Sequence, residues 1–144
     1  MGSGRGLMDR LLLDTHAWIW LIADSGQIAP TTKQVVTSAQ KERILFASVI
    51  SVWEAANLEA RGRVQLGAGV HAWLEQSLAD DGIQLLPLSP QIAIESTRLP
   101  GDLHRDPADR ILAATARTEG LTLLTRDVRL LDYGRKGHLR TRKI

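Results

Sequence analysis

The sequence predicts a single α/β domain in which helices cover both faces of a parallel sheet. Short, continuously apolar segments alternate with longer segments of helical character along the chain. Such uninterrupted apolar strands are typical of parallel sheets that are buried on both sides, and right-handed crossovers then give a doubly wound arrangement. A length of 144 residues suits one domain and is too short for two separate cores. We assign the domain to residues 7–144.

The first half of the chain is predicted to contain two strands and three helices. In order, these are a strand over 11–13, a helix over 15–22, a helix over 29–40, a strand over 44–47 and a helix that ends near residue 61. Pro30 is well placed in a first helical turn. The third helix has two candidate caps, Ser48 and Ser51, and Gly62 marks its end.

The second half continues the alternation of strands and helices. Its predicted elements are a helix over 69–80, a strand over 83–86, a helix over 89–98, a helix over 106–119, a strand over 121–124 and one helical turn over 128–131. Pro100-Gly101 indicates a loop, and Gly120 ends a helix. A fifth strand near the end of the chain has little support, because that segment is polar and basic. The sequence alone therefore predicts four to five parallel strands.

The composition excludes several classes of protein. There is no cysteine, so disulfides, thiolate catalysis and cysteine-based zinc sites are ruled out. No apolar run approaches the ~18 residues of a membrane span, and Met1–Gly6 lacks a following apolar stretch of the signal-peptide kind. We interpret residues 1–6 as a remnant of cloning or a disordered terminus, and we expect a cytoplasmic protein without membrane contact.

Four acidic residues occupy comparable positions relative to the predicted strands. Asp14 ends the first strand, Asp127 follows the fourth, Glu54 lies early in the helix after the second, and Asp109 lies in the first turn of the helix before the fourth. The carboxyl ends of parallel strands share one edge of the sheet, which is where such folds bind ligands. Asp109 joins this group if the loop before its helix folds over that edge.

Clustered carboxylates repel one another and raise each other's pKa, and a hard divalent cation relieves this repulsion. Oxygen ligands are those that Mg²⁺ prefers, and the waters that it keeps suit phosphodiester hydrolysis. We therefore expect Mg²⁺ or Mn²⁺ at a site formed by Asp14, Glu54, Asp109 and Asp127. The four histidines show no ligand spacing that would favour zinc.

Each acid also has a purely structural interpretation. Asp14 can cap the following helix, and Ser51-Val52-Trp53-Glu54 matches a capping box. Asp106 can cap a helix that has Pro107 in its first position and Asp109 two residues later. The functional hypothesis therefore depends on four acids at four separate strand edges rather than on any single motif.

The distribution of charge is compatible with a polyanionic partner. The net charge is +2, and setting aside four clustered carboxylates leaves +6 on the remaining surface. Five cations without an intervening acid lie in residues 134–144: Arg135, Lys136, Arg140, Arg142 and Lys143. A basic surface around an acidic cleft suits RNA, whereas a solvated tail that keeps the protein soluble is an equal alternative.

The motifs that carry these acids resemble those of PIN-domain proteins of the VapC toxin type. They are Leu11-Leu12-Leu13-Asp14-Thr15-His16-Ala17, Ser48-Val49-Ile50-Ser51-Val52-Trp53-Glu54, Leu103-His104-Arg105-Asp106-Pro107-Ala108-Asp109-Arg110 and Leu123-Leu124-Thr125-Arg126-Asp127. They follow the family's order and spacing over residues 10–133. The resemblance implies a three-layer α/β/α PIN-like domain and a metal-dependent endoribonuclease, often acting on tRNA or another structured RNA. It also implies a cognate antitoxin and frequent homodimers.

The resemblance assigns the family's acidic quartet to Asp14, Glu54, Asp109 and Asp127, as catalytic and metal-binding residues. Asp106 competes with Asp109 for its place but is better explained as a helix cap. Arg105 and Arg110 flank this pair and are candidate contacts for RNA phosphates; pairing with nearby acids is the structural alternative.

Other functions fit the sequence less well. A phosphatase with a nucleophilic aspartate after the first strand would typically carry a second acid two residues later, where this chain has His16. A receiver-type domain would need a late strand ending in lysine, which is not found. A catalytically weak PIN-like module that binds RNA or protein remains the main alternative, although all four acids are present.

Overall fold

The computed structural model describes residues 9–144, so the predicted separate terminus at residues 1–6 lies outside the described residues. Five strands form one parallel sheet in the order β3-β2-β1-β4-β5. The strands are β1 (Leu11–Leu13), β2 (Leu45–Ser48), β3 (Gln84–Leu86), β4 (Thr122–Thr125) and β5 (Thr141–Lys143). The chain builds outward from the central β1 to β2 and β3 on one side, and later to β4 and β5 on the other.

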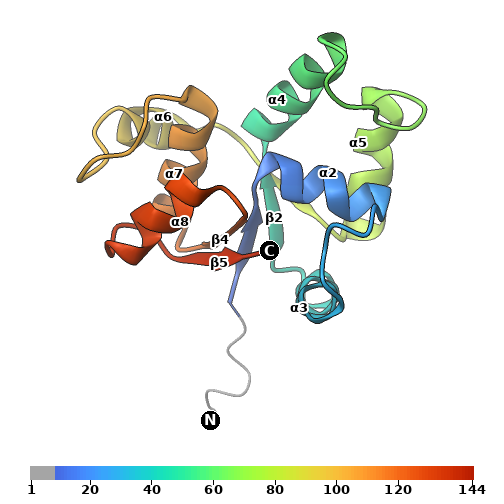
Figure 1. The fold of residues 1–144 in the computed structure, drawn as a ribbon, viewed down its shortest axis with the longest axis horizontal. Coiled ribbons are helices and arrows are strands. Elements are labelled where there is room, and N and C mark those ends of the chain that lie inside the picture. Colours follow the sequence, from blue (N-terminus) through green and yellow to red (C-terminus); the bar gives the residue numbers. More distant parts are fainter. Residues whose placement is uncertain (1–8) are drawn as a thin grey trace.

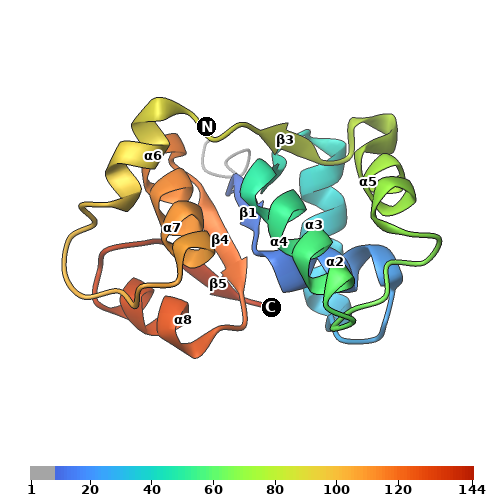
Figure 2. The ribbon, with the colours of Figure 1, turned by 90° about the horizontal axis from the view of Figure 1, so that it is seen from above.

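Helices cover both faces of the sheet, which gives three layers (Figures 1 and 2). The helices are α2 (Thr15–Ala23), α3 (Pro30–Lys41), α4 (Val49–Ala60), α5 (Val70–Leu78), α6 (Pro90–Ser96), α7 (Pro107–Glu119) and α8 (Val128–Arg135), with a 3₁₀ turn at Ala79–Asp81. Figure 2 shows α6, α7 and α8 together on one side, and α2, α3 and α5 on the other. Within residues 9–144, every helix is too short or too polar to cross a membrane.

Alternating residues of the strands enter two separate hydrophobic clusters. Leu11 and Leu13 pack with Trp18 of α2 and Trp73 of α5, and the two indole rings lie 4.5 Å apart between centroids. Leu12, between them in sequence, packs on the opposite face with residues of α7 and α8. Because side chains of a strand point alternately to the two faces, a continuous leucine run is the pattern that a doubly covered strand requires. The predicted three-layer α/β/α fold is confirmed.

Two C-terminal elements differ from the prediction. The predicted single turn after β4 is the eight-residue helix α8, and the weakly supported last strand exists as β5, which pairs in parallel with β4. The sequence Thr141-Arg142-Lys143 carries no apolar pattern because β5 is an edge strand with largely exposed side chains. Charged residues are common on such edges, where they discourage pairing with other chains. Doubt about a strand in this basic tail was therefore misplaced.

The start of α4 resolves the choice between two serines. Ser48 is the cap, since its hydroxyl accepts a hydrogen bond of 3.1 Å from the backbone N–H of Ile50. Ser51 lies inside the helix and is fully buried. The Ser51–Glu54 capping box is therefore wrong, and Glu54 lies in the second turn of the helix rather than at its third position.

Gly134 lets α8 approach β5 closely, and we expect Gly134→Ala to destabilise the protein. A Cβ atom at this position would lie 2.5 Å from Oγ1 and 2.8 Å from Cγ2 of Thr141. Overpacking of this kind costs about 1–3 kcal/mol, which exceeds the ~1 kcal/mol that alanine gains over glycine in a helix. Urea unfolding should show the loss, with Arg135→Ala as an exposed control on the same helix. A Gly134→Ala protein of unchanged or greater stability would contradict this packing.

Candidate active site

The carboxyl ends of β1 and β4 border a small acidic pocket. These two strands are neighbours although many residues separate them in sequence, and the chain leaves them in opposite directions along the sheet. Such a switch point is where doubly wound sheets bind ligands. The pocket has a volume of about 170 Å³ and is lined by Asp14, Thr15, His16, Glu54, Asp106, Asp109, Asp127 and Arg129. All four predicted acids line it, and Asp106 joins them.

Asp14 is both a helix cap and a wall of the pocket. Its Oδ1 accepts a hydrogen bond of 2.8 Å from the backbone N–H of Ala17, and its Oδ2 accepts one from the hydroxyl of Thr125. Burial raises the pKa of the Asp14 carboxyl above its ordinary value, in spite of these two hydrogen bonds. The helix-cap interpretation is thus correct, but it does not displace the functional one, because the same carboxylate lines the pocket.

Glu54 enters the pocket from the second turn of α4. Its Oε1 accepts a hydrogen bond from the hydroxyl of Thr15, whose oxygen also lies 2.9 Å from the Oγ of Ser51. Ser51 and Thr15 are almost fully buried. This contact joins the start of α2 to α4, and it holds the Glu54 carboxylate in the pocket that Asp14 also lines.

The negative charge of Asp109 is disfavoured by burial and by the neighbouring acids. Burial, together with the nearby charges of Asp106 and Asp127, raises the pKa of Asp109 to about 6, although a hydrogen bond to His104 acts in the opposite direction. Its Oδ2 lies 2.6 Å from Nε2 of His104 and 3.8 Å from a guanidinium nitrogen of Arg129. A divalent cation bound beside Asp109 would offset the repulsion between its carboxylate and those of Asp106 and Asp127.

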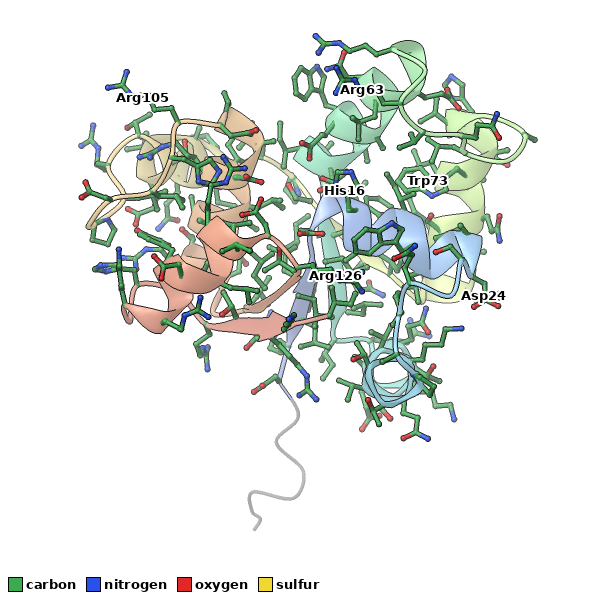
Figure 3. All side chains as sticks on the ribbon, viewed as in Figure 1. His16, Asp24, Arg63, Trp73, Arg105 and Arg126 are labelled. Carbon is green, nitrogen blue, oxygen red and sulfur yellow. The ribbon has the colours of Figure 1, made fainter. Side chains whose placement is uncertain are left out.

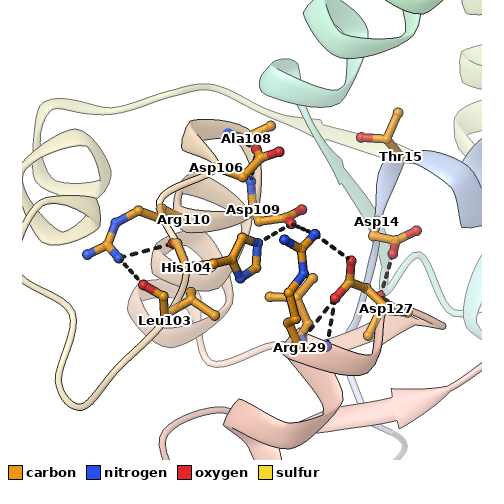
Figure 4. Close-up of polar contacts among 12 residues, drawn as sticks. Asp14, Thr15, Leu103, His104, Asp106, Ala108, Asp109, Arg110, Asp127 and Arg129 are labelled. Atoms are coloured by element: carbon orange, nitrogen blue, oxygen red, sulfur yellow. Dashed lines mark hydrogen bonds and ion pairs between the residues drawn. The ribbon is translucent and has the colours of Figure 1, made fainter.

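Asp127 and Arg129 close the pocket on the side of α8 (Figure 4). Oδ1 of Asp127 caps α8 by accepting from the backbone N–H groups of Arg129 and Leu130, at 2.8 and 3.2 Å. Its Oδ2 lies 3.2 Å from the guanidinium of Arg129. Burial alone would raise the pKa of Asp127, but the hydrogen bonds from Arg129 and Leu130 lower it below its ordinary value.

The capping acids use one carboxylate oxygen for the helix, and their other oxygen accepts from no backbone N–H group among the described residues. Asp106 caps α7 as predicted, since its Oδ1 accepts from the backbone N–H groups of Ala108 and Asp109 at 2.9 and 3.2 Å. Asp14 and Asp127 also take their backbone N–H groups on Oδ1. Three helix N-termini therefore hold carboxylates in place at one sheet edge, and the partial positive charge of each helix end favours them.

The two predicted arginines have different environments. Arg105 is exposed and points away from the body of the protein (Figure 3). Arg110 instead donates to the backbone carbonyl oxygens of Ser96, Leu103 and His104, at 2.9, 2.9 and 3.3 Å. Most of the hydrogen-bonding capacity of Arg110 is thus spent on holding the segment before α7.

Two residues that contact the acids were not identified from the sequence. His104 and Arg129 both reach Asp109, but neither has a spacing that stands out as ligand-like. The nearest available signal was proximity, since His104 lies two residues before Asp106 and Arg129 two residues after Asp127. The basic tail, by contrast, contributes no side chain to the lining of this pocket.

The oxygen atoms that line the pocket are of the kind that bind hard divalent cations. Five carboxylates and a threonine hydroxyl line the pocket, and oxygen ligands of this kind are those of Mg²⁺ and Mn²⁺. The raised pKa of Asp109 and that of Asp14 show that the chain alone leaves negative charge incompletely compensated there. Within residues 9–144, no three acidic or histidine side chains stand in an arrangement close enough to hold one ion.

Fold and pocket together define a doubly wound α/β protein with a polyacidic site at the switch point between β1 and β4. The model of the PIN domain family matches residues 11–136. The chain is 34% identical to Ribonuclease VapC22 of Mycobacterium tuberculosis over 126 residues, which is 88% of this chain and 93% of that protein. The chain therefore belongs to the PIN domain family, and its resemblance to VapC proteins is confirmed.

Solved structures with the same fold come from toxin–antitoxin complexes. VapBC from Salmonella typhimurium, bound to DNA, matches with a TM-score of 0.70 at 18% identity, covering 94% of this chain and 98% of that one. VapBC2 from Rickettsia felis, bound to a fragment of its promoter, matches with a TM-score of 0.69 at 15% identity, covering 92% and 97%. At these identities the likeness concerns the fold.

Proposed function

We propose that this protein is a metal-dependent endoribonuclease and the toxin of a toxin–antitoxin pair. The observation that carries the proposal is the convergence of Asp14, Glu54, Asp109 and Asp127 from four separate elements on one pocket. The similarity to Ribonuclease VapC22 supports RNA as the substrate. Structured RNA, such as tRNA, is the substrate class that we favour.

In this proposal Asp14 and Asp109 hold Mg²⁺ or Mn²⁺ directly, and Glu54 and Asp127 complete the site through water or a second ion. The bound cation supplies an activated water and positive charge for the phosphate oxygens. The protein contributes fixed carboxylates, because helix caps and the Thr15 and Thr125 hydroxyls already hold three of them in place. Arg105 contacts the RNA backbone, and Arg110 supports the segment that carries it.

The identity of the products tests this mechanism. Attack by water in line with the leaving 3′-oxygen leaves a 5′-phosphate and a 3′-hydroxyl. Cleavage of a 5′-labelled tRNA pool in Mn²⁺, followed by phosphatase and kinase treatment of the fragments, identifies both ends. A 2′,3′-cyclic phosphate, or undiminished cleavage after removal of metal with chelator, would overturn the proposal.

Arg129 competes with the cation in this proposal, and we expect Arg129→Gln to tighten Mn²⁺ binding about two- to fivefold. The guanidinium lies beside two of the carboxylates, and exposed ion pairs of this kind are weak, so the expected change is small. Titration of free Mn²⁺ by electron paramagnetic resonance, without RNA, measures the change. Arg135→Gln, on the same helix outside the pocket, is the control, and unchanged or weaker binding by Arg129→Gln would contradict the competition.

We further propose that a cognate antitoxin and a second copy of this chain are partners. Support comes from the neighbouring structures, which are antitoxin complexes, and from α4, the helix that carries Glu54, where Val49 and Trp53 are 38% and 59% exposed. A basic antitoxin side chain suits the carboxylates as an inhibitor. Size-exclusion chromatography with light scattering tests the homodimer, and a monomer at micromolar concentration would count against it.

A further inference from the structure

His104 contacts the acidic site, but the mechanism above gives this side chain no role. It lies in the connection between α6 and α7, and its Nε2 is 2.6 Å from Oδ2 of Asp109. The side chains of His104 and Asp109 are only 16% and 15% exposed. Figure 4 shows the imidazole pointing directly at this carboxylate. A short, shielded hydrogen bond to a charged group is among the stronger kinds in proteins.

Asp109 differs from the other aspartates in how it is held. Backbone N–H groups fix the carboxylates of Asp14, Asp106 and Asp127, whereas Asp109 receives none among the described residues. Its own N–H is instead given to Asp106. Side chains alone therefore orient this carboxylate, and the guanidinium of Arg129, at 3.8 Å, is too far for a hydrogen bond.

The backbone around His104 is fixed in turn by Arg110. One guanidinium nitrogen donates to the carbonyl oxygens of Leu103 and His104, and Nε donates to the carbonyl of Ser96 at the end of α6. Arg110 follows Asp109 on α7, so the residue next to the acid holds the segment that bears its hydrogen-bond donor (Figure 4). The arrangement is a closed loop of contacts around one carboxylate.

We propose that His104 is a positioning residue, which orients the carboxylate of Asp109 for the divalent cation and is itself held by Arg110. The inference rests on the proposed metal-dependent function. An ionised carboxylate only accepts, so Nε2 carries the hydrogen. Nδ1 is buried and has no partner among the described residues, so the contact of Nε2 with Asp109 is the hydrogen bond that the ring makes there. This hydrogen bond engages Oδ2 of Asp109, which leaves Oδ1 for the cation.

A pair of substitutions separates the hydrogen bond from packing. His104→Gln keeps an N–H group at a similar reach, whereas His104→Leu keeps similar volume without a donor. Loss of hydrogen bonds that orient metal ligands typically costs about 10- to 100-fold in metal affinity. We expect His104→Leu to weaken Mn²⁺ binding at least tenfold, and His104→Gln to stay within about threefold of the wild-type protein.

The measurement is Mn²⁺ titration by electron paramagnetic resonance on the whole protein without RNA. His71→Leu, an exposed histidine on α5, is the matched control and should leave Mn²⁺ affinity unchanged. Equal losses in the leucine and glutamine variants, or no loss in either, would overturn the inference. If the wild-type protein binds no Mn²⁺ at all, the proposed metal dependence itself fails.

A second measurement does not require the leucine variant to fold. Nitrogen-15 NMR of histidine side chains in the wild-type protein with Mg²⁺ reports which ring nitrogen of His104 carries the hydrogen. We expect the Nε2–H tautomer, and Asp109→Ala should shift its Nε2–H signal while leaving that of His71 unchanged. Finding hydrogen on Nδ1 alone would overturn the inference, because Nε2 would then have nothing to donate.

Discussion

Asp14→Asn should lower RNA cleavage by a factor of about 10²–10³ while leaving the fold intact. The substitution removes the charge of a carboxylate that ends the central strand and that we propose holds the cation. Loss of one such electrostatic contact typically costs about 3–4 kcal/mol of transition-state stabilisation. The amide can retain the cap, because its oxygen still accepts from the N–H of Ala17, and its NH₂ group faces the hydroxyl of Thr125.

Cleavage of labelled RNA under single-turnover conditions measures this loss, and circular dichroism verifies the fold. Asp132→Asn is a matched control, since Asp132 is a half-exposed aspartate that pairs with Lys136 on α8 and does not line the pocket. Retained activity in the folded Asp14→Asn protein would refute the assignment of the active site. If the Asp14→Asn protein unfolds, the helix cap requires a carboxylate. The folding of Asp14→Glu, which keeps one, would then be compared with that of Asp14→Asn.

Asp109→Asn should stabilise the metal-free protein at pH 7 by about 1–2 kcal/mol while abolishing cleavage. The carboxyl of Asp109 is buried beside Asp106 and Asp127, so its ionisation is unfavourable in the folded state. An amide of the same shape carries no charge and can still accept a hydrogen bond from His104. This result would show that a proposed metal ligand lowers the folding stability while no cation is bound.

The stabilisation should depend on pH in a defined direction. The pKa of Asp109 is about 6 in the folded protein against an ordinary value of 3.8, so the folded state holds its proton more tightly. The free energy of unfolding of the wild-type protein therefore falls, relative to Asp109→Asn, as pH rises from 3.8 to about 6, and the difference is constant above that. Shifts at Asp14 and Asp127 occur in both proteins and largely cancel in the comparison.

Urea unfolding of both proteins between pH 4 and 8, with and without Mg²⁺, checks this prediction. Without metal, the advantage of Asp109→Asn should grow over the stated window. With Mg²⁺, the wild-type protein should gain stability by mass action and the variant should gain less. A variant that is less stable than the wild-type protein at pH 7 would mean that the charge of Asp109 is already compensated within the chain.

The strands and the positions of the acids could be predicted because the residue pattern depends directly on burial and on strand order. Leu11-Leu12-Leu13 is apolar at every position since both faces of β1 are covered, and no surface strand needs that pattern. Asp14 and Asp127 follow β1 and β4, which are paired in the sheet. The rule that parallel strands share a carboxyl edge was enough to bring them together.

Other features depend on contacts that leave no periodic trace. The edge strand β5 is polar because solvent covers it, so its pairing with β4 shows only in three dimensions. Arg110 has the position expected of an RNA contact, yet its guanidinium faces three carbonyl oxygens of its own chain. Whether an arginine meets solvent or backbone is decided by how the segment before α7 folds.

The capping aspartates both stabilise helix N-termini and line the acidic pocket, so relatives that have lost activity would be expected to keep them. An aspartate that terminates a helix is retained by selection for stability even after catalysis has been lost, so Asp14, Asp106 and Asp127 are poor markers of activity. Glu54 caps no helix, and among the described residues its side-chain hydrogen bond is to Thr15. In a comparison of related sequences, the residue at the position of Glu54 is therefore the better indicator of whether a protein has kept its activity.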